Sequence, residues 1–153
     1  MQPVVSWYEA DNETVLSKWD IGTVDAGNSS TEKTILIWNN RSGAEDVSDM
    51  QECKITTTDN QGDVDDLITQ KWIQCRVDSA GETEFGVDAG IGGVVAKDIK
   101  AEGQQDGIIK GTANSGALSD ISNYAKVTLM AEPPLNAPAG LRNFKVRVSY
   151  YYT

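Results

Sequence analysis

The sequence predicts an all-β fold of about eight or nine strands in two packed sheets, with one short helix. Three observations support this prediction. Apolar and polar residues alternate in segments of about five to seven residues, as strands with one buried face require. Glycine, asparagine, aspartate and proline separate these segments. Almost no segment has the 3.6-residue period of an amphipathic helix.

The first half of the chain contains five segments with this alternation, and each is predicted to be a strand: Val4–Glu9, Trp19–Val24, Thr34–Asn39, Cys53–Asp59 and Lys71–Val77. A short helix is predicted over Asp63–Gln70. Its opening residues Asp63, Asp65 and Asp66 suit a helix N-terminus, where the backbone dipole favours negative charge.

The middle of the chain is less regular, and three short strands joined by glycine-rich turns are predicted there: Glu84–Val87, Val94–Lys100 and Gln105–Lys110. The clearest strand is the last, Phe144–Tyr152, and Asn123–Ala131 is its predicted partner. The prolines of Glu132–Gly140, which cannot donate to a central ladder, predict a crossing loop between them. No repeat or linker interrupts the pattern, so residues 1–153 are predicted to form one domain.

The charge of the chain restricts its partners. Lysine and arginine total 13 against 23 aspartate and glutamate residues, which gives a net charge of −10. Nucleic acid and anionic membranes are therefore poor partners, because both would repel it. The first residues, Met1–Glu9, include no basic segment with a following apolar run, and no later run approaches a membrane span. We expect a protein made and used in the cytoplasm, or released by lysis.

Histidine is absent from the chain, which removes the commonest general base and the Ser-His-Asp arrangement. No catalytic residue and no cofactor are predicted. A weak glycosidase stays open as an alternative, because Glu82 with Glu84, or Asp63 with Asp65, would share one face of a strand. The glycine run at residues 90–93 lacks the lysine of a phosphate-binding loop, so we expect a turn there.

Two further groups could carry chemistry. Asp59, Asp63 and Asp65 gather hard oxygen ligands in one segment and form a weak calcium candidate, although the spacing does not match a helix-loop-helix calcium loop. Cys53 and Cys75 both alternate in phase with core residues. Two buried free thiols are favoured over a disulfide, and pairing of the two stays open.

Six residues are candidates for contacts with a partner protein. Trp7 and Tyr8 lie in the first strand, Leu36 and Trp38 in the strand Thr34–Asn39, and Arg147 and Tyr151 on the outward face of the last strand. Ile35 and Ile37 take one face of their strand, which leaves the two bulky side chains Leu36 and Trp38 on the other. Such a strand is either central and covered on both faces, or half exposed at an interface, and the interface is slightly favoured.

Parts of the chain resemble immunoglobulin-like modules. The segments Trp19–Gly27 and Thr34–Asn40 are similar to their opening strands, and Pro134–Gly140 with Phe144–Tyr152 is similar to their last loop and closing strand. The sequence Trp-Asn-Asn-Arg at residues 38–41 and the closing Val148–Thr153 look like small structural proteins of tailed bacteriophages. These resemblances imply an immunoglobulin-like β-sandwich in a virion component assembled in the host cytoplasm.

Two classes of function follow. The leading hypothesis is a phage virion protein, either a capsid decoration protein or a neck or tail accessory subunit. It would bind other virion proteins, repeat as a homo-oligomer around a symmetry axis, and contact neither nucleic acid nor membrane. The other class is a carbohydrate- or receptor-binding module that uses surface tryptophans such as Trp38 or Trp72.

Overall fold

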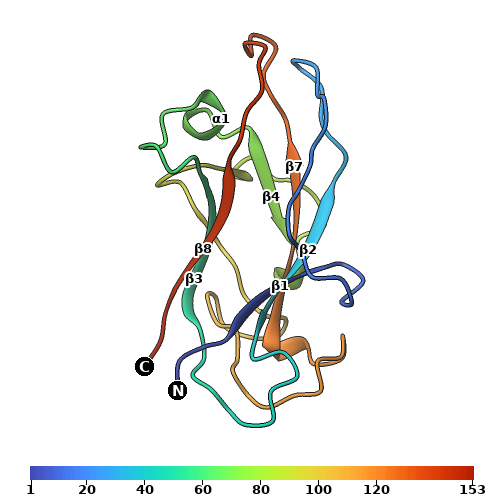
Figure 1. Cartoon of the computed structure of the whole chain (residues 1–153), viewed down its shortest axis with the longest axis vertical. Helices are drawn as coiled ribbons and strands as arrows, with labels where there is room; N and C mark the ends of the chain where they lie inside the picture. The colour runs from blue at the N-terminus through green and yellow to red at the C-terminus, as the bar shows by residue number, and fades with distance from the viewer.

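A computed structural model describes residues 1–153 and contains two antiparallel sheets that share one core (Figure 1). In spatial order, the first sheet contains β1 (Val5–Glu9), β2 (Lys33–Asn39), β7 (Tyr124–Ala131), β4 (Ile73–Val77) and β5 (Gly90–Ile91). The second contains β6 (Lys97–Asp98), β3 (Gln51–Thr58) and β8 (Lys145–Tyr151). The predicted all-β, sandwich-like fold is confirmed, whereas its immunoglobulin-like assignment stays a prediction.

The core lies between the sheets and contains 19 buried residues in one cluster. The first sheet supplies inward residues such as Ile35 and Leu129, and the second supplies Ile55. Each of these three is at most 1% exposed. Burial of one such side chain stabilises the fold by about 1.5–3 kcal/mol. Because alternation places an apolar side chain on the inner face at every second position of a strand, it accounts for the packing of the two sheets.

The short helix is confirmed and is shorter than predicted. It spans α1 (Asp66–Thr69), and Asp65 caps its start by accepting a hydrogen bond from the backbone N–H of Leu67 at 2.8 Å. Two 3₁₀ turns, η1 (Asp78–Ala80) and η2 (Ile121–Asn123), complete the helical elements. None of the helices has the length and apolarity that a membrane crossing requires.

Three predicted strands are wrong. Residues 19–24 and 84–87 form no strand, and residues 105–110 contribute only an isolated bridge between Met50 and Ile109. The prediction at residues 94–100 is reduced to β6. Residues 19–24 do alternate, because Trp19 and Ile21 pack against the core. Alternation records which side chains are buried, and it does not require a hydrogen-bonded neighbour.

The predicted partner of the last strand is also wrong. β7 pairs with β2 and β4 in the first sheet, while β8 pairs with β3 in the second. Residues 132–144 do cross between these strands, and the crossing takes the chain from one sheet to the other (Figure 1). Both strands present one apolar face to the same core, so their patterns are alike and cannot show which strands are neighbours.

Candidate protein-interaction site

Leu36 and Trp38, two of the six predicted contact residues, are not at the surface. Leu36 is 1% exposed and Trp38 is not exposed at all. With Tyr124 they form a second, smaller core on the outer face of the first sheet, where the rings of Trp38 and Tyr124 lie 4.6 Å apart. The prediction of a half-exposed strand is therefore wrong, and β2 is a central strand covered on both faces.

Asn12 and Arg41 cover this second core. The indole N–H of Trp38 donates to Asn12 Oδ1 at 2.9 Å. The guanidinium of Arg41 lies 4.0 Å from the ring centroid of Tyr8 and donates to the Tyr8 hydroxyl at 3.2 Å and to the carbonyl of Asn12 at 2.6 Å. Tyr8 is thus half-buried beneath Arg41, and its ring and hydroxyl both have partners within the chain.

The other tryptophans are also packed. Trp72 is 6% exposed and lies beneath the guanidinium of Arg142, 4.6 Å from its ring centroid. Trp7 and Trp19 are half-buried against the main core. A sugar-binding platform needs an exposed aromatic face, and the two residues proposed for it, Trp38 and Trp72, do not provide one.

The weak calcium candidate is not arranged as a metal site. Asp59 accepts hydrogen bonds from the backbone N–H groups of Gln61, Asp63, Val64 and Asp65 at 2.8–3.2 Å. Asp63 accepts a hydrogen bond from the Thr58 hydroxyl at 2.6 Å. Asp65 accepts hydrogen bonds from the backbone N–H of Leu67, which caps α1, and from the guanidinium of Arg142. No group of three acidic or cysteine side chains is positioned to hold a cation. These carboxylates stabilise the turn that leads into α1.

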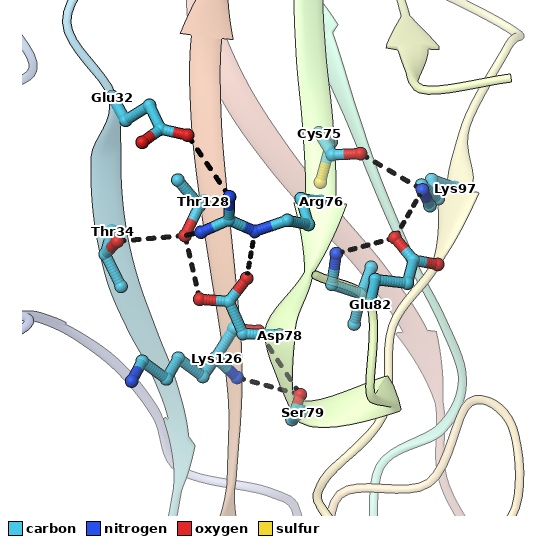
Figure 2. A network of polar contacts seen from close by, with 11 residues as sticks. Glu32, Thr34, Cys75, Arg76, Asp78, Ser79, Glu82, Lys97, Lys126 and Thr128 are labelled. Carbon is cyan, nitrogen blue, oxygen red and sulfur yellow. Dashed lines mark hydrogen bonds and ion pairs between the residues drawn. The ribbon is translucent and has the colours of Figure 1, made fainter. Parts of the chain in front are cut away.

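The outer face of the first sheet carries a polar network centred on Arg76 (Figure 2). The Arg76 guanidinium donates to Asp78 at 2.7 Å, to Glu32 at 3.1 Å and to the Thr128 hydroxyl at 3.2 Å. Thr128 in turn donates to Asp78 at 2.9 Å and lies 2.9 Å from the Thr34 hydroxyl. Thr34, Thr128 and Arg76 lie in β2, β7 and β4, so the network ties three neighbouring strands together.

A second part of this network holds Glu82 (Figure 2). Glu82 Oε1 accepts hydrogen bonds from Lys97 Nζ at 2.7 Å and from the backbone N–H of Val77 at 2.9 Å. Lys97 Nζ also donates to the carbonyl of Cys75 at 3.0 Å. Glu82 is therefore engaged in joining β4 to β6, whereas Glu84 is exposed. Glu82 and Glu84, the carboxylate pair considered for a glycosidase, therefore lie in different surroundings.

Cys53 and Cys75 are free thiols in the main core, and neither is exposed to solvent. Burial in apolar surroundings disfavours the charged thiolate and raises the pKa of both thiols to about 12. Since the thiolate is the reactive form, these cysteines act as small apolar core residues.

Arg147 and Tyr151, by contrast, are exposed on the outward face of β8, and Tyr151 keeps 69% of its surface. Lys145 and Ser149 are exposed on the same face. The two basic residues Lys145 and Arg147 take part in no ion pair, whereas six of the 13 basic residues of the chain do: Lys33, Lys54, Arg76, Lys97, Lys110 and Arg142. We call Lys145, Arg147, Ser149 and Tyr151 the β8 face.

One edge of β8 has no neighbour. β8 is the last strand of its sheet and pairs only with β3, and apart from this ladder no backbone hydrogen bond joins residues 139–153 to another segment. An unpaired edge presents a row of N–H and C=O groups on which a further strand can form. We call this row the β8 edge.

The core-facing side of β8 is also incompletely covered. Val146, Val148 and Tyr150 pack against the main core but keep intermediate exposure. The inward residues Cys53, Ile55 and Thr57 of the neighbouring β3 are fully buried. The sandwich is therefore closed at β3 and open at β8, which places apolar side chains beside the β8 edge.

The sequence already showed which residues of the last strand face outward, and the structure agrees. The sequence pattern does not show that this strand has a free edge, because it predicts residues 123–131 as the neighbour of β8 and the neighbour is β3. It also missed Asn12 and Arg41 as the cover of Trp38. Arg41 lies three residues after Trp38, and that spacing alone carries no signal for a contact back to Tyr8.

The chain matches no protein-family model, no curated protein and no solved structure. Its class therefore rests on the residues described above: a two-sheet β protein with an open edge at β8, and with unpaired basic residues and an exposed tyrosine on the face beside that edge.

Proposed function

We propose that this chain is a structural protein of a bacteriophage virion, a capsid decoration protein that docks on the particle through protein–protein contacts. The observation that carries the binding part is the β8 face, where Arg147 and Tyr151 are exposed. Arginine and tyrosine are enriched at protein interfaces, and they dominate binding energies when a partner desolvates them. The virion part is supported by the resemblance of residues 38–41 and Val148–Thr153 to small phage structural proteins.

The charge of the β8 face would determine how the protein is oriented on a partner. The chain as a whole has a net charge of −10, so most of its surface repels an acidic partner. Lys145 and Arg147 are basic, exposed and unpaired on one face. An acidic patch on the particle would attract this face and repel the others, which would fix the orientation in which the protein docks.

Co-sedimentation tests the proposal. Particles of the phage whose genome encodes the chain, prepared without it, are mixed with the purified protein and sedimented. The wild-type protein should travel with capsids, and Arg147→Glu should weaken binding at least tenfold. Lys126→Glu makes the same charge change on an exposed residue of β7 in the other sheet, so it should bind as the wild type does.

Three outcomes would contradict the proposal. Wild-type protein that stays in the supernatant with every particle fraction would reject the virion role. Binding to tails but not to capsids would reject the decoration role and favour a neck or tail subunit. Equal losses for Arg147→Glu and Lys126→Glu would reject the β8 face as the contact.

A further inference from the structure

We infer that the β8 edge pairs with the β8 edge of a second copy of this chain, antiparallel about a twofold axis at Val148. The inference rests on the proposed function only in that both involve β8. Docking on a particle uses the outward side chains of the strand. Self-pairing uses its backbone edge and the half-buried side chains on its inward face.

The β8 edge lacks most of the features that keep natural edges from pairing. Such edges are short, bulged, charged, interrupted by proline or covered by a loop. Of these features β8 has only the charges of Lys145 and Arg147, which lie on its outward face. β8 is seven residues long and contains no proline, and no segment other than β3 bonds to its backbone. The one irregularity of this ladder lies in β3, between Gln51 and Lys54, on the far side of β8 from the free edge.

The hydrogen bonds of β3 show which residues of β8 point to the free edge. The carbonyls of Cys53 and Thr57 accept hydrogen bonds from Ile99 and Gly93, on the side of β3 away from β8. The direction of the backbone N–H and C=O groups alternates along a strand, so those of Lys54, Thr56 and Thr58 point toward β8. They bond the backbone groups of the residues opposite them in β8, which are Ser149, Arg147 and Lys145. The N–H and C=O groups of Val146, Val148 and Tyr150 therefore point to the free edge.

A twofold axis at Val148 uses all of these groups. It places Val148 opposite Val148 of the partner subunit and Val146 opposite Tyr150 of the partner subunit. Each of these pairs exchanges two N–H···O hydrogen bonds in an antiparallel ladder. Because the residues that pair are those whose backbone groups point outward, no bond to β3 has to break.

The order of side chains along the β8 face fits this register. Its basic residues, Lys145 and Arg147, lie in the first half of the strand, and Ser149 and Tyr151 lie in the second. The axis at Val148 places Arg147 opposite the partner's Ser149 and Lys145 opposite the partner's Tyr151, a cation beside an aromatic ring. An axis at Arg147 would instead oppose two arginines, which destabilises a strand pair.

Pairing would also complete the core on the open side of the sandwich. Val146, Val148 and Tyr150 are half-buried in one chain, and the same residues of the partner subunit would cover them. The two three-stranded sheets would join into one sheet of order β6-β3-β8-β8-β3-β6. The β8 faces of both copies would then lie side by side on a continuous surface and double the area offered to a particle.

Sedimentation equilibrium of the purified chain tests the inference. We expect a concentration-dependent mass that approaches twice the 16.6 kDa of one chain. Ser149→Glu places a carboxylate opposite the partner's Arg147 twice in each dimer, and should lower the dissociation constant about three- to tenfold. Ser149→Arg should raise it by a similar factor. The same two changes at the exposed loop residue Ser29 are the controls and should have no such effect.

The sign of the Ser149→Glu effect separates self-pairing from general repulsion. Two chains of charge −10 repel each other, and two added carboxylates would increase that repulsion, so net charge alone predicts a weaker dimer. A stronger dimer therefore supports the register at Val148. A mass of one chain at every concentration, or weaker association in both Ser149 variants, would overturn the inference. A monomer that still binds particles would overturn the dimer alone, and a dimer that binds none would overturn the proposed function alone.

Discussion

Replacing Trp38 by phenylalanine should destabilise the fold by about 2–3 kcal/mol, because Trp38 belongs to a covered second core. Its side chain is fully buried, and its indole N–H donates to Asn12 Oδ1 at 2.9 Å. Loss of that hydrogen bond costs about 1 kcal/mol. The gap left by the missing ring atoms adds about 1–2 kcal/mol. Trp38→Ala, which removes the whole ring system, should cost about 3–5 kcal/mol.

Urea unfolding followed by far-UV circular dichroism measures these losses as shifts of the midpoint, with the slope of the transition unchanged. Tyr151→Ala is the control, because Tyr151 was a contact candidate like Trp38 but is 69% exposed. It should change stability by less than about 0.5 kcal/mol at protein concentrations too low for association. If Trp38→Phe shifted the midpoint no more than Tyr151→Ala does, the second core would not be part of the cooperative fold.

Three further predictions follow from buried or constrained groups. Gly92→Ala should destabilise by about 2 kcal/mol or more, because an added Cβ would lie 2.1 Å from the carbonyl oxygen of Ile68. Gly86→Ala, whose Cβ meets nothing within 4 Å, should be neutral or slightly stabilising in the same urea unfolding measurement, and equal effects of the two would refute the packing argument. Ellman's reagent should label neither Cys53 nor Cys75 in the native protein at mildly alkaline pH and both in urea. Because the pKa of both buried thiols is raised, their contribution to the free energy of unfolding is fully present below the ordinary thiol pKa of 9.0 and is lost as the pH rises toward about 12. Rapid labelling of the native protein, or a stability that does not fall over this pH range, would count against their burial. The backbone N–H of Gln61, with those of Asp63, Val64 and Asp65, holds the pKa of Asp59 below its usual 3.8. The stability that the Asp59 carboxylate contributes is therefore present above that pH and disappears as the pH falls through the lowered pKa. Asp59→Asn should lose less stability on acidification than the wild type, and parallel urea midpoints across this range would contradict that assignment.

The strands that the sequence predicted well are those with long alternation that ends in turn residues. In β8 and β2, every second residue packs toward the core, and this period of two is visible without a structure. The pattern failed for residues 19–24, where Trp19 and Ile21 alternate toward the core in a segment with no strand neighbour. Sequence alternation reports burial, whereas a strand also needs a hydrogen-bonded partner.

The candidate site was predicted only in part, for a related reason. Arg147 and Tyr151 were identified because the outward face of a single strand can be counted along the chain. The burial of Trp38 depends on Asn12 and Arg41, which reach it from separate turns. The free edge of β8 depends on β3, which lies about ninety residues earlier in the chain. Contacts between distant segments are set by the assembled fold, so local patterns do not contain them.

Amide hydrogen exchange of β8, followed by NMR over a range of protein concentrations, tests most directly whether this strand is an open assembly edge. The N–H of Ser149 points to β3, so it should be protected at every concentration. The N–H of Val148 points to the free edge, so it should exchange quickly in dilute protein and slow as the concentration rises. Exchange at Val148 that is equally fast at all concentrations would contradict self-pairing, and protection already present in the monomer would contradict the open edge itself.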